Sequence, residues 1–110
     1  MAEDSERPDG IVTFTDEALL DLAEIDNSTA VLWGPTQADR YIKFLIQNCR
    51  QIAENPTNAP RIKRFPDYRC FLCKYSNKRW SHGHRIIYKE VPDGIEIIAL
   101  IHTASDIETN

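Results

Sequence analysis

Four side chains of the zinc-ligand type stand close together in this sequence: Cys70, Cys73, His82 and His84. The order Cys-x-x-Cys followed by His-x-His is a composition that can hold a zinc ion. On a β-strand, however, residues three apart point to opposite faces, so a strand through Cys70 and Cys73 separates their thiols unless a turn intervenes. We therefore expect buried free thiols, with no metal and no cofactor.

Three further side chains are candidates for acid–base or phosphate chemistry: Arg85, Lys89 and His102. Histidine titrates near neutral pH and can act as a general acid or base, but a lone histidine can equally cap the end of a strand. Arg85 and Lys89 are four residues apart, so they share one face of a strand with Ile87 between them. There they either flank a phosphate or a partner carboxylate, or only keep that face soluble. The sequence leaves these alternatives open.

Charge is strongly segregated along the chain. Residues 1–60 carry a net charge of −7, residues 61–89 carry nine bases against one acid, and residues 90–110 carry five acids and no base. Such a basic segment indicates a nucleic-acid or acidic protein partner, with solvated basic strands as the simpler alternative. Trp80 lies among these bases, where an aromatic ring suits base stacking or a protein anchor, or folds back over a sheet. The residues expected to bind a target or partner are Lys63, Arg64, Arg69, Lys74, Arg79, Trp80, Arg85 and Lys89.

The length of 110 residues allows one hydrophobic core and one domain. We expect residues 1–10 to form a flexible acidic tail and residues 11–110 to form the domain. No apolar run approaches the ~20 residues of a membrane span, and the acidic start is unlike a signal peptide. Three sparse cysteines do not make a secreted disulfide framework. We therefore expect a cytoplasmic protein with no membrane association.

Two helices are predicted in the first half of the chain. Thr15 precedes two acids and is typical of an N-cap, so the first helix begins there. Leu19, Leu22 and Ala23 are expected on its buried face, with Asp21 and Glu24 turned to water. The second helix is expected to begin at Gly34-Pro35 and to end before Asn55-Pro56. Its buried stripe is Ala38, Tyr41, Ile42, Leu45, Cys49, Ile52 and Ala53.

Strands are predicted on both sides of this helical pair. A short strand covers residues 11–14, a second covers 68–75, and two β-branched runs, 82–91 and 95–102, form a hairpin around the turn Pro92-Asp93-Gly94. Along the chain, one strand is followed by two helices and then by three strands, and this order predicts an α+β fold. In it, a short N-terminal strand and an αα-hairpin pack on a mainly antiparallel sheet.

This order, together with four short motifs, resembles the RelE/ParE family of toxins, and its ParE branch in particular. The motifs are Gly34-Pro35-Thr36-Gln37-Ala38 at the start of the second helix, the Asn55-Pro56 stop, Arg85-Ile86-Ile87-Tyr88 in a strand, and the ending His102-x-x-x-Asp106. The resemblance spans residues 11–107. It implies the toxin component of a type II toxin–antitoxin system, which inhibits growth and is neutralised by a cognate antitoxin.

The resemblance also implies two alternative mechanisms. ParE-like members are thought to poison DNA gyrase without known catalysis, whereas RelE-like members cut mRNA on the ribosome with basic and tyrosine side chains. Arg85 occupies the place of the arginine that RelE-like enzymes use to stabilise transition-state phosphate charge. Residues 103–110, however, contain neither the bases nor the tyrosine of RelE-like enzymes. Gyrase inhibition is therefore preferred. The alternatives are a ribosome-dependent mRNA endonuclease, with Arg85, Lys89 and His102 as catalytic candidates, and an inert binding module of the same fold.

Overall fold

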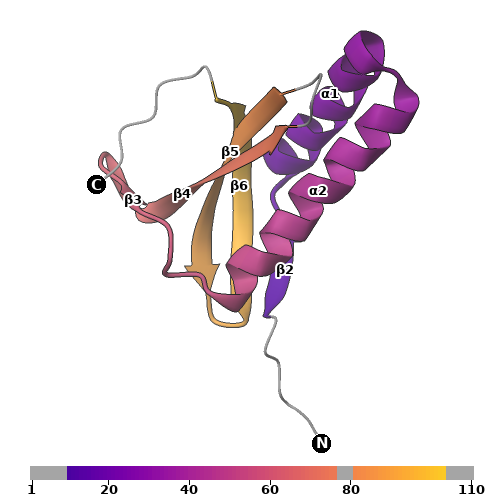
Figure 1. Cartoon of the computed structure of the whole chain (residues 1–110). Coiled ribbons are helices and arrows are strands. Elements are labelled where there is room, and N and C mark those ends of the chain that lie inside the picture. Colours follow the sequence, from indigo (N-terminus) through magenta and orange to yellow (C-terminus); the bar gives the residue numbers. More distant parts are fainter. Residues whose placement is uncertain (1–9, 77–80, 104–110) are drawn as a thin grey trace, which may run out of the picture.

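The structure is a computed structural model that describes residues 10–76 and 81–103 of the chain (Figure 1). It contains two long helices and five strands in the described ranges. In chain order these are β2 (Ile11–Phe14), α1 (Asp16–Trp33), α2 (Pro35–Glu54), β3 (Arg61–Ile62), β4 (Phe65–Ser76), β5 (Ser81–Val91) and β6 (Gly94–His102).

The strands form one mixed sheet in the order β2-β6-β5-β4-β3. β2 runs parallel to β6, and the other neighbours are antiparallel. The predicted hairpin is β5–β6, and the predicted α+β architecture is confirmed. Gly94, at the start of β6, faces the backbone of Ile11 so closely that a Cβ atom there would overlap it. The two-residue strand β3 was not predicted, because so short a segment carries no periodicity.

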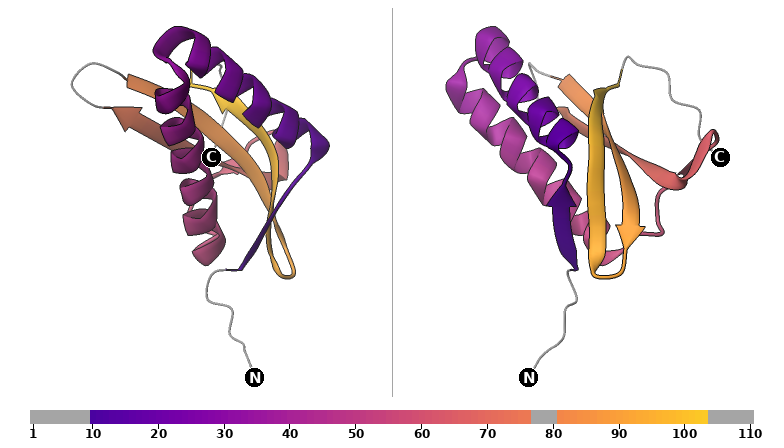
Figure 2. Two further views of the ribbon diagram at one scale, coloured as in Figure 1. Left: turned by 90° about the vertical axis from the view of Figure 1, so that its right-hand side faces the viewer. Right: turned by 180° about the vertical axis from the view of Figure 1, so that it is seen from behind.

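Both helices pack on the same face of the sheet, and no helix of the described residues lies on the other face (Figures 1 and 2). They run side by side as a hairpin joined at Gly34, whose φ of 94° lies in the region that favours glycine. Among the described residues, no helix has the combination of length and apolar character that crossing a membrane demands.

The predicted stripe of α2 forms the centre of the core. Ala38, Tyr41, Leu45, Cys49, Ile52 and Ala53 are buried and Ile42 is partly buried. All of them except Ala38 belong to one core cluster with the helix-facing side chains of the hairpin, which are Ile86, Tyr88, Ile95, Ile97 and Leu100. The 3.6-residue spacing of the stripe therefore translated directly into a buried face.

The predicted face of α1 is only partly right. Leu22 packs against the core and Glu24 is exposed, as expected. Leu19 and Ala23 are exposed, however, and the buried residues of α1 are Ala18, Ile25 and Thr29. Asp21, expected in water, accepts a hydrogen bond from the backbone N–H of Leu100 at 2.9 Å. Because β2 pairs with β6 only as far as Ile97, that N–H needs a side-chain partner, and α1 rotates to supply one. The predicted N-cap is confirmed, since Thr15 Oγ1 accepts the N–H of Ala18 at 3.1 Å.

Candidate functional site

We call the sheet face turned away from the helices the open face. It carries an apolar strip. Ile62, Cys70 and Ile87 are buried in its middle, and Tyr68, Ile98, Ala99 and Ile101 pack around them. At its margin Phe65 and Leu72 are 60% and 48% exposed. No described helix covers this strip (Figure 2). An apolar surface of this kind is typical of a protein-binding site.

Basic side chains border the open face. Arg85 and Lys89 extend from β5 on the same side as Ile87, because strand residues two apart share a face. Nη1 of Arg85 donates to the Thr103 carbonyl at 2.9 Å, and Nζ of Lys89 lies 3.8 Å from a Glu96 carboxylate oxygen. Of the other predicted bases, Lys63, Arg64 and Lys74 are exposed. Arg79 and Trp80 lie outside the described residues.

Arg69 was expected to be an exposed base, but it is buried. It is only 8% exposed, and its Nε donates to Glu90 at 2.9 Å. Its Nη1 donates to the backbone carbonyls of Ala59 at 2.7 Å and Thr57 at 3.2 Å. These bonds fasten the segment between α2 and β3 to the sheet, so Arg69 belongs to the scaffold. Charge along the sequence does not distinguish such a buried cation from a surface one.

All three histidines of the chain gather at one end of the sheet, on the helix side. The ring centroids of His82 and His84, both on β5, are 5.1 Å apart, and the ring of His102 on β6 lies 5.1 and 5.4 Å from them. The hydroxyl of Tyr41 and Nδ1 of His84 share a 2.8 Å hydrogen bond. His102 was treated as isolated in the sequence, but the hairpin register places it directly opposite His84.

The cluster favours the neutral imidazole of His84 and of His82. Burial, together with the neighbouring His82 and His102, lowers the pKa of His84 to about 4. Burial and His102 likewise lower the pKa of His82. His84 is therefore uncharged at neutral pH and has little capacity to act as a general acid there.

We expect the free energy of unfolding to fall as the pH is lowered from 6.5 toward 4. The folded-state pKa of His84 lies below its unfolded value of 6.5, so the unfolded chain takes up the proton first. The contribution of neutral His84 to the free energy of unfolding is therefore complete above pH 6.5. As the pH falls toward 4, this contribution is lost, and the free energy of unfolding decreases by on the order of 2–3 kcal/mol. Urea titrations at pH 7 and pH 4.5 measure it. His84→Gln does not titrate, so a pH dependence as steep in that variant as in the wild type would refute the assignment.

The cysteines are placed on both faces of the sheet. Cys70 belongs to the open-face cluster, whereas Cys73 packs with Cys49 in the core beneath the helices. All three are free and buried, and burial raises the pKa of the Cys49 and Cys73 thiols to about 12. Within the described ranges, no group of three or more His, Cys, Asp or Glu side chains is arranged to hold a metal ion.

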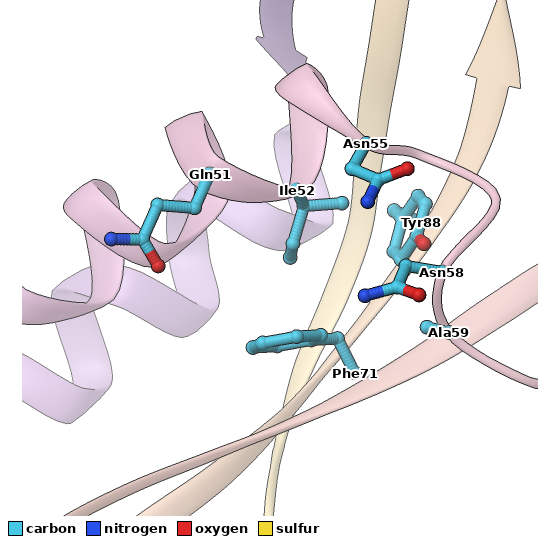
Figure 3. A pocket seen from close by; sticks show the side chains of 7 residues that line it. All are labelled: Gln51, Ile52, Asn55, Asn58, Ala59, Phe71 and Tyr88. Carbon is cyan, nitrogen blue, oxygen red and sulfur yellow. The ribbon is translucent and has the colours of Figure 1, made fainter.

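A pocket of about 290 Å³ lies between the C-terminal end of α2 and β4 (Figure 3). Phe71 and Ile52 form an apolar part of its wall, and the carboxamides of Gln51, Asn55 and Asn58 lie around them. The hydroxyl of Tyr88 is already committed, because it donates to the Pro56 carbonyl at 2.6 Å. Nothing in the sequence singled out this pocket, since its walls come from separate elements.

An αα-hairpin packed on one face of a five-stranded mixed sheet is an α+β fold consistent with that of ParE-like toxins. The family described as "ParE toxin of type II toxin-antitoxin system, parDE" matches residues 12–107. The chain therefore belongs to the ParE toxin family of type II toxin–antitoxin systems, as the resemblance in its sequence predicted.

The fold is also similar to a solved structure described as "Chromosomal ParDE TA system from P. aeruginosa". The two chains superpose with a TM-score of 0.65 at 18% sequence identity. The match covers 87% of this chain and 98% of the other. No curated protein matches the sequence.

Proposed function

We propose that this chain is a cytoplasmic toxin that inhibits DNA gyrase by binding it, and that a cognate antitoxin holds it inactive. Membership of the ParE family supports a toxin with an antitoxin partner. The choice of a binding mechanism over catalysis depends on one observation, which is the placement of the three catalytic candidates.

Those candidates occupy opposite faces of the sheet. Arg85 and Lys89 lie on the open face, where Arg85 donates to the Thr103 carbonyl. His102 lies on the helix side against His82 and His84. A nuclease needs its acid, base and cation within hydrogen-bond reach of one phosphodiester. Separation by the thickness of a sheet favours a binding role for these residues.

The open face has the make-up of a protein interface. Its centre is apolar, and its border carries cations that can be matched by acidic groups on a partner. Large exposed side chains such as Leu72 and Phe65 provide apolar contact area beside the cations. We assign gyrase binding to this face, with Lys63, Arg64, Lys74, Arg85 and Lys89 as the contributing bases.

Expression of the chain without an antitoxin tests the proposal. A gyrase inhibitor is expected to arrest growth, to induce a DNA-damage response and to leave transcripts intact. Codon-phased cuts in mRNA within minutes, without that response, would instead establish a ribosome-dependent endonuclease. Normal growth at high expression of folded protein would leave the inert binding module as the correct alternative.

A further inference from the structure

Large exposed apolar side chains gather on two surfaces of the molecule. In the part of the chain that the structure describes, eight such side chains are exposed, and two of them, Phe65 and Leu72, border the open face. Five others belong to α1, with exposed fractions between 48% and 77%: Leu19, Leu20, Val31, Leu32 and Trp33. Single exposed apolar residues are ordinary, whereas a concentration on one element indicates an interaction site.

The outward side of α1 carries a stripe that the core does not use. It consists of four exposed residues, Leu20, Ala23, Asn27 and Val31, which we call the α1 stripe. Intervals of three and four residues place them on one face of the helix. α1 packs against α2 and β6 through its other side, where Ile25 is buried. The stripe is about 16 Å long, at a rise of about 1.5 Å per residue.

The charges of α1 and of the open face are opposite in sign. α1 carries no base, and its acids are Asp16, Glu17, Asp21, Glu24 and Asp26. All of them except Asp21 are exposed. The open face carries the bases named above, and Glu96 on β6 lies beside one of them, Lys89. An acidic and apolar surface therefore exists on the same molecule as a basic and apolar one, and the two are complementary.

The two surfaces also suit each other in shape. A helix lying on one face of a sheet is the packing by which this fold already covers its core. β4 and β5 pair without a break from Arg69 to Ser76, a length of roughly 25 Å that accommodates the α1 stripe. A helix on the open face would place Leu20 and Val31 against the apolar strip and the neighbouring acids beside the bases at its border.

We infer that the chain self-associates head to tail, with the α1 stripe of one copy docked on the open face of the next. The contact joins two different surfaces, so it is heterologous, and a docked pair still offers one α1 stripe and one open face to further copies. A contact made by a single helix is small, so the association is expected to be reversible and to depend on concentration. A docked copy covers the bases to which gyrase binding is assigned. This consequence rests on the proposed function, whereas the contact itself does not.

Sedimentation velocity of the full chain at increasing concentration tests the inference. We expect the average mass of the wild-type chain to rise above that of a monomer. The double variant Leu20→Lys and Val31→Lys places bases against the basic open face and should weaken association by about tenfold or more. The variant Arg85→Glu and Lys89→Glu should weaken it equally, because it places acids against the acidic helix. Gln47→Lys and Gln51→Lys add the same charge to the exposed side of α2 and should leave association unchanged.

A mixture of the α1 variant and the open-face variant identifies the two surfaces as partners. Each variant alone should be a monomer, but their equimolar mixture should associate, because one retains the open face and the other retains the α1 stripe. Association of either variant alone would indicate a symmetric contact and overturn the inference. A wild-type chain that stays monomeric would also overturn it, even if a variant failed to fold, and would leave gyrase inhibition unaffected. If the wild-type chain were monomeric and the α1 variant lost affinity for the cognate antitoxin, the α1 stripe would belong to the antitoxin and the inference would be wrong.

Discussion

Replacing Leu45 by Asp is expected to remove most of the stability of the folded protein. Leu45 lies in the middle of α2, is fully buried and belongs to the core cluster with Tyr41, Tyr88 and Ile97. An aspartate at this position would bury an unpaired charge and remove the packing of the leucine. The expected cost is on the order of 4–5 kcal/mol, which approaches the total stability of a small domain. Circular dichroism melts and urea titrations measure it.

Leu20→Asp provides the matched control on the other helix. Leu20 is 65% exposed on α1, so the same substitution there should change the melting temperature by only a degree or two. If Leu45→Asp were equally mild, α2 would not pack on the sheet through this stripe and the architecture would be incorrect.

The second large effect is expected when the open face is reversed in charge. The double variant Arg85→Glu and Lys89→Glu should abolish the growth arrest caused by the wild-type chain. It places acids opposite the acidic groups with which the partner would match Arg85 and Lys89. Like charges at an interface cost several kcal/mol, which corresponds to a loss of affinity of roughly a hundredfold or more. Growth curves and binding to purified gyrase measure the effect.

The control variant changes the net charge of the protein by the same amount, but on the helices instead of the open face. Arg40→Glu and Arg50→Glu alter two exposed bases of α2 and should leave the arrest unchanged. Both double variants must retain the wild-type melting temperature. Arrest that persists in the Arg85 and Lys89 variant, at equal protein levels, would remove the open face from the binding mechanism.

The elements with strong periodicity could be predicted from the sequence. The stripe from Ala38 to Ala53 and the two β-branched runs around Asp93 each carry a repeat that local geometry enforces. The face of α1 could be predicted only in part, because the rotation of this helix depends on a hydrogen bond between Asp21 and Leu100, 79 residues apart. Tertiary contacts of this kind override weak local patterns.

The candidate site was predictable only in part. The pairing of Arg85 and Lys89 on one face follows from strand alternation, and so does the separation of Cys70 from Cys73. The burial of Arg69 depends on carbonyl groups of the segment after α2, and the pocket around Phe71 depends on how α2 crosses β4. Neither arrangement leaves a local signature in the sequence.

The most direct test of the central claim is a supercoiling assay with purified DNA gyrase and relaxed plasmid. The folded chain is expected to inhibit the reaction, and the cognate antitoxin is expected to restore it when added in equal amount. The Arg85→Glu and Lys89→Glu variant should not inhibit. Undiminished supercoiling in the presence of an excess of folded wild-type chain would contradict the claim that this protein acts on gyrase.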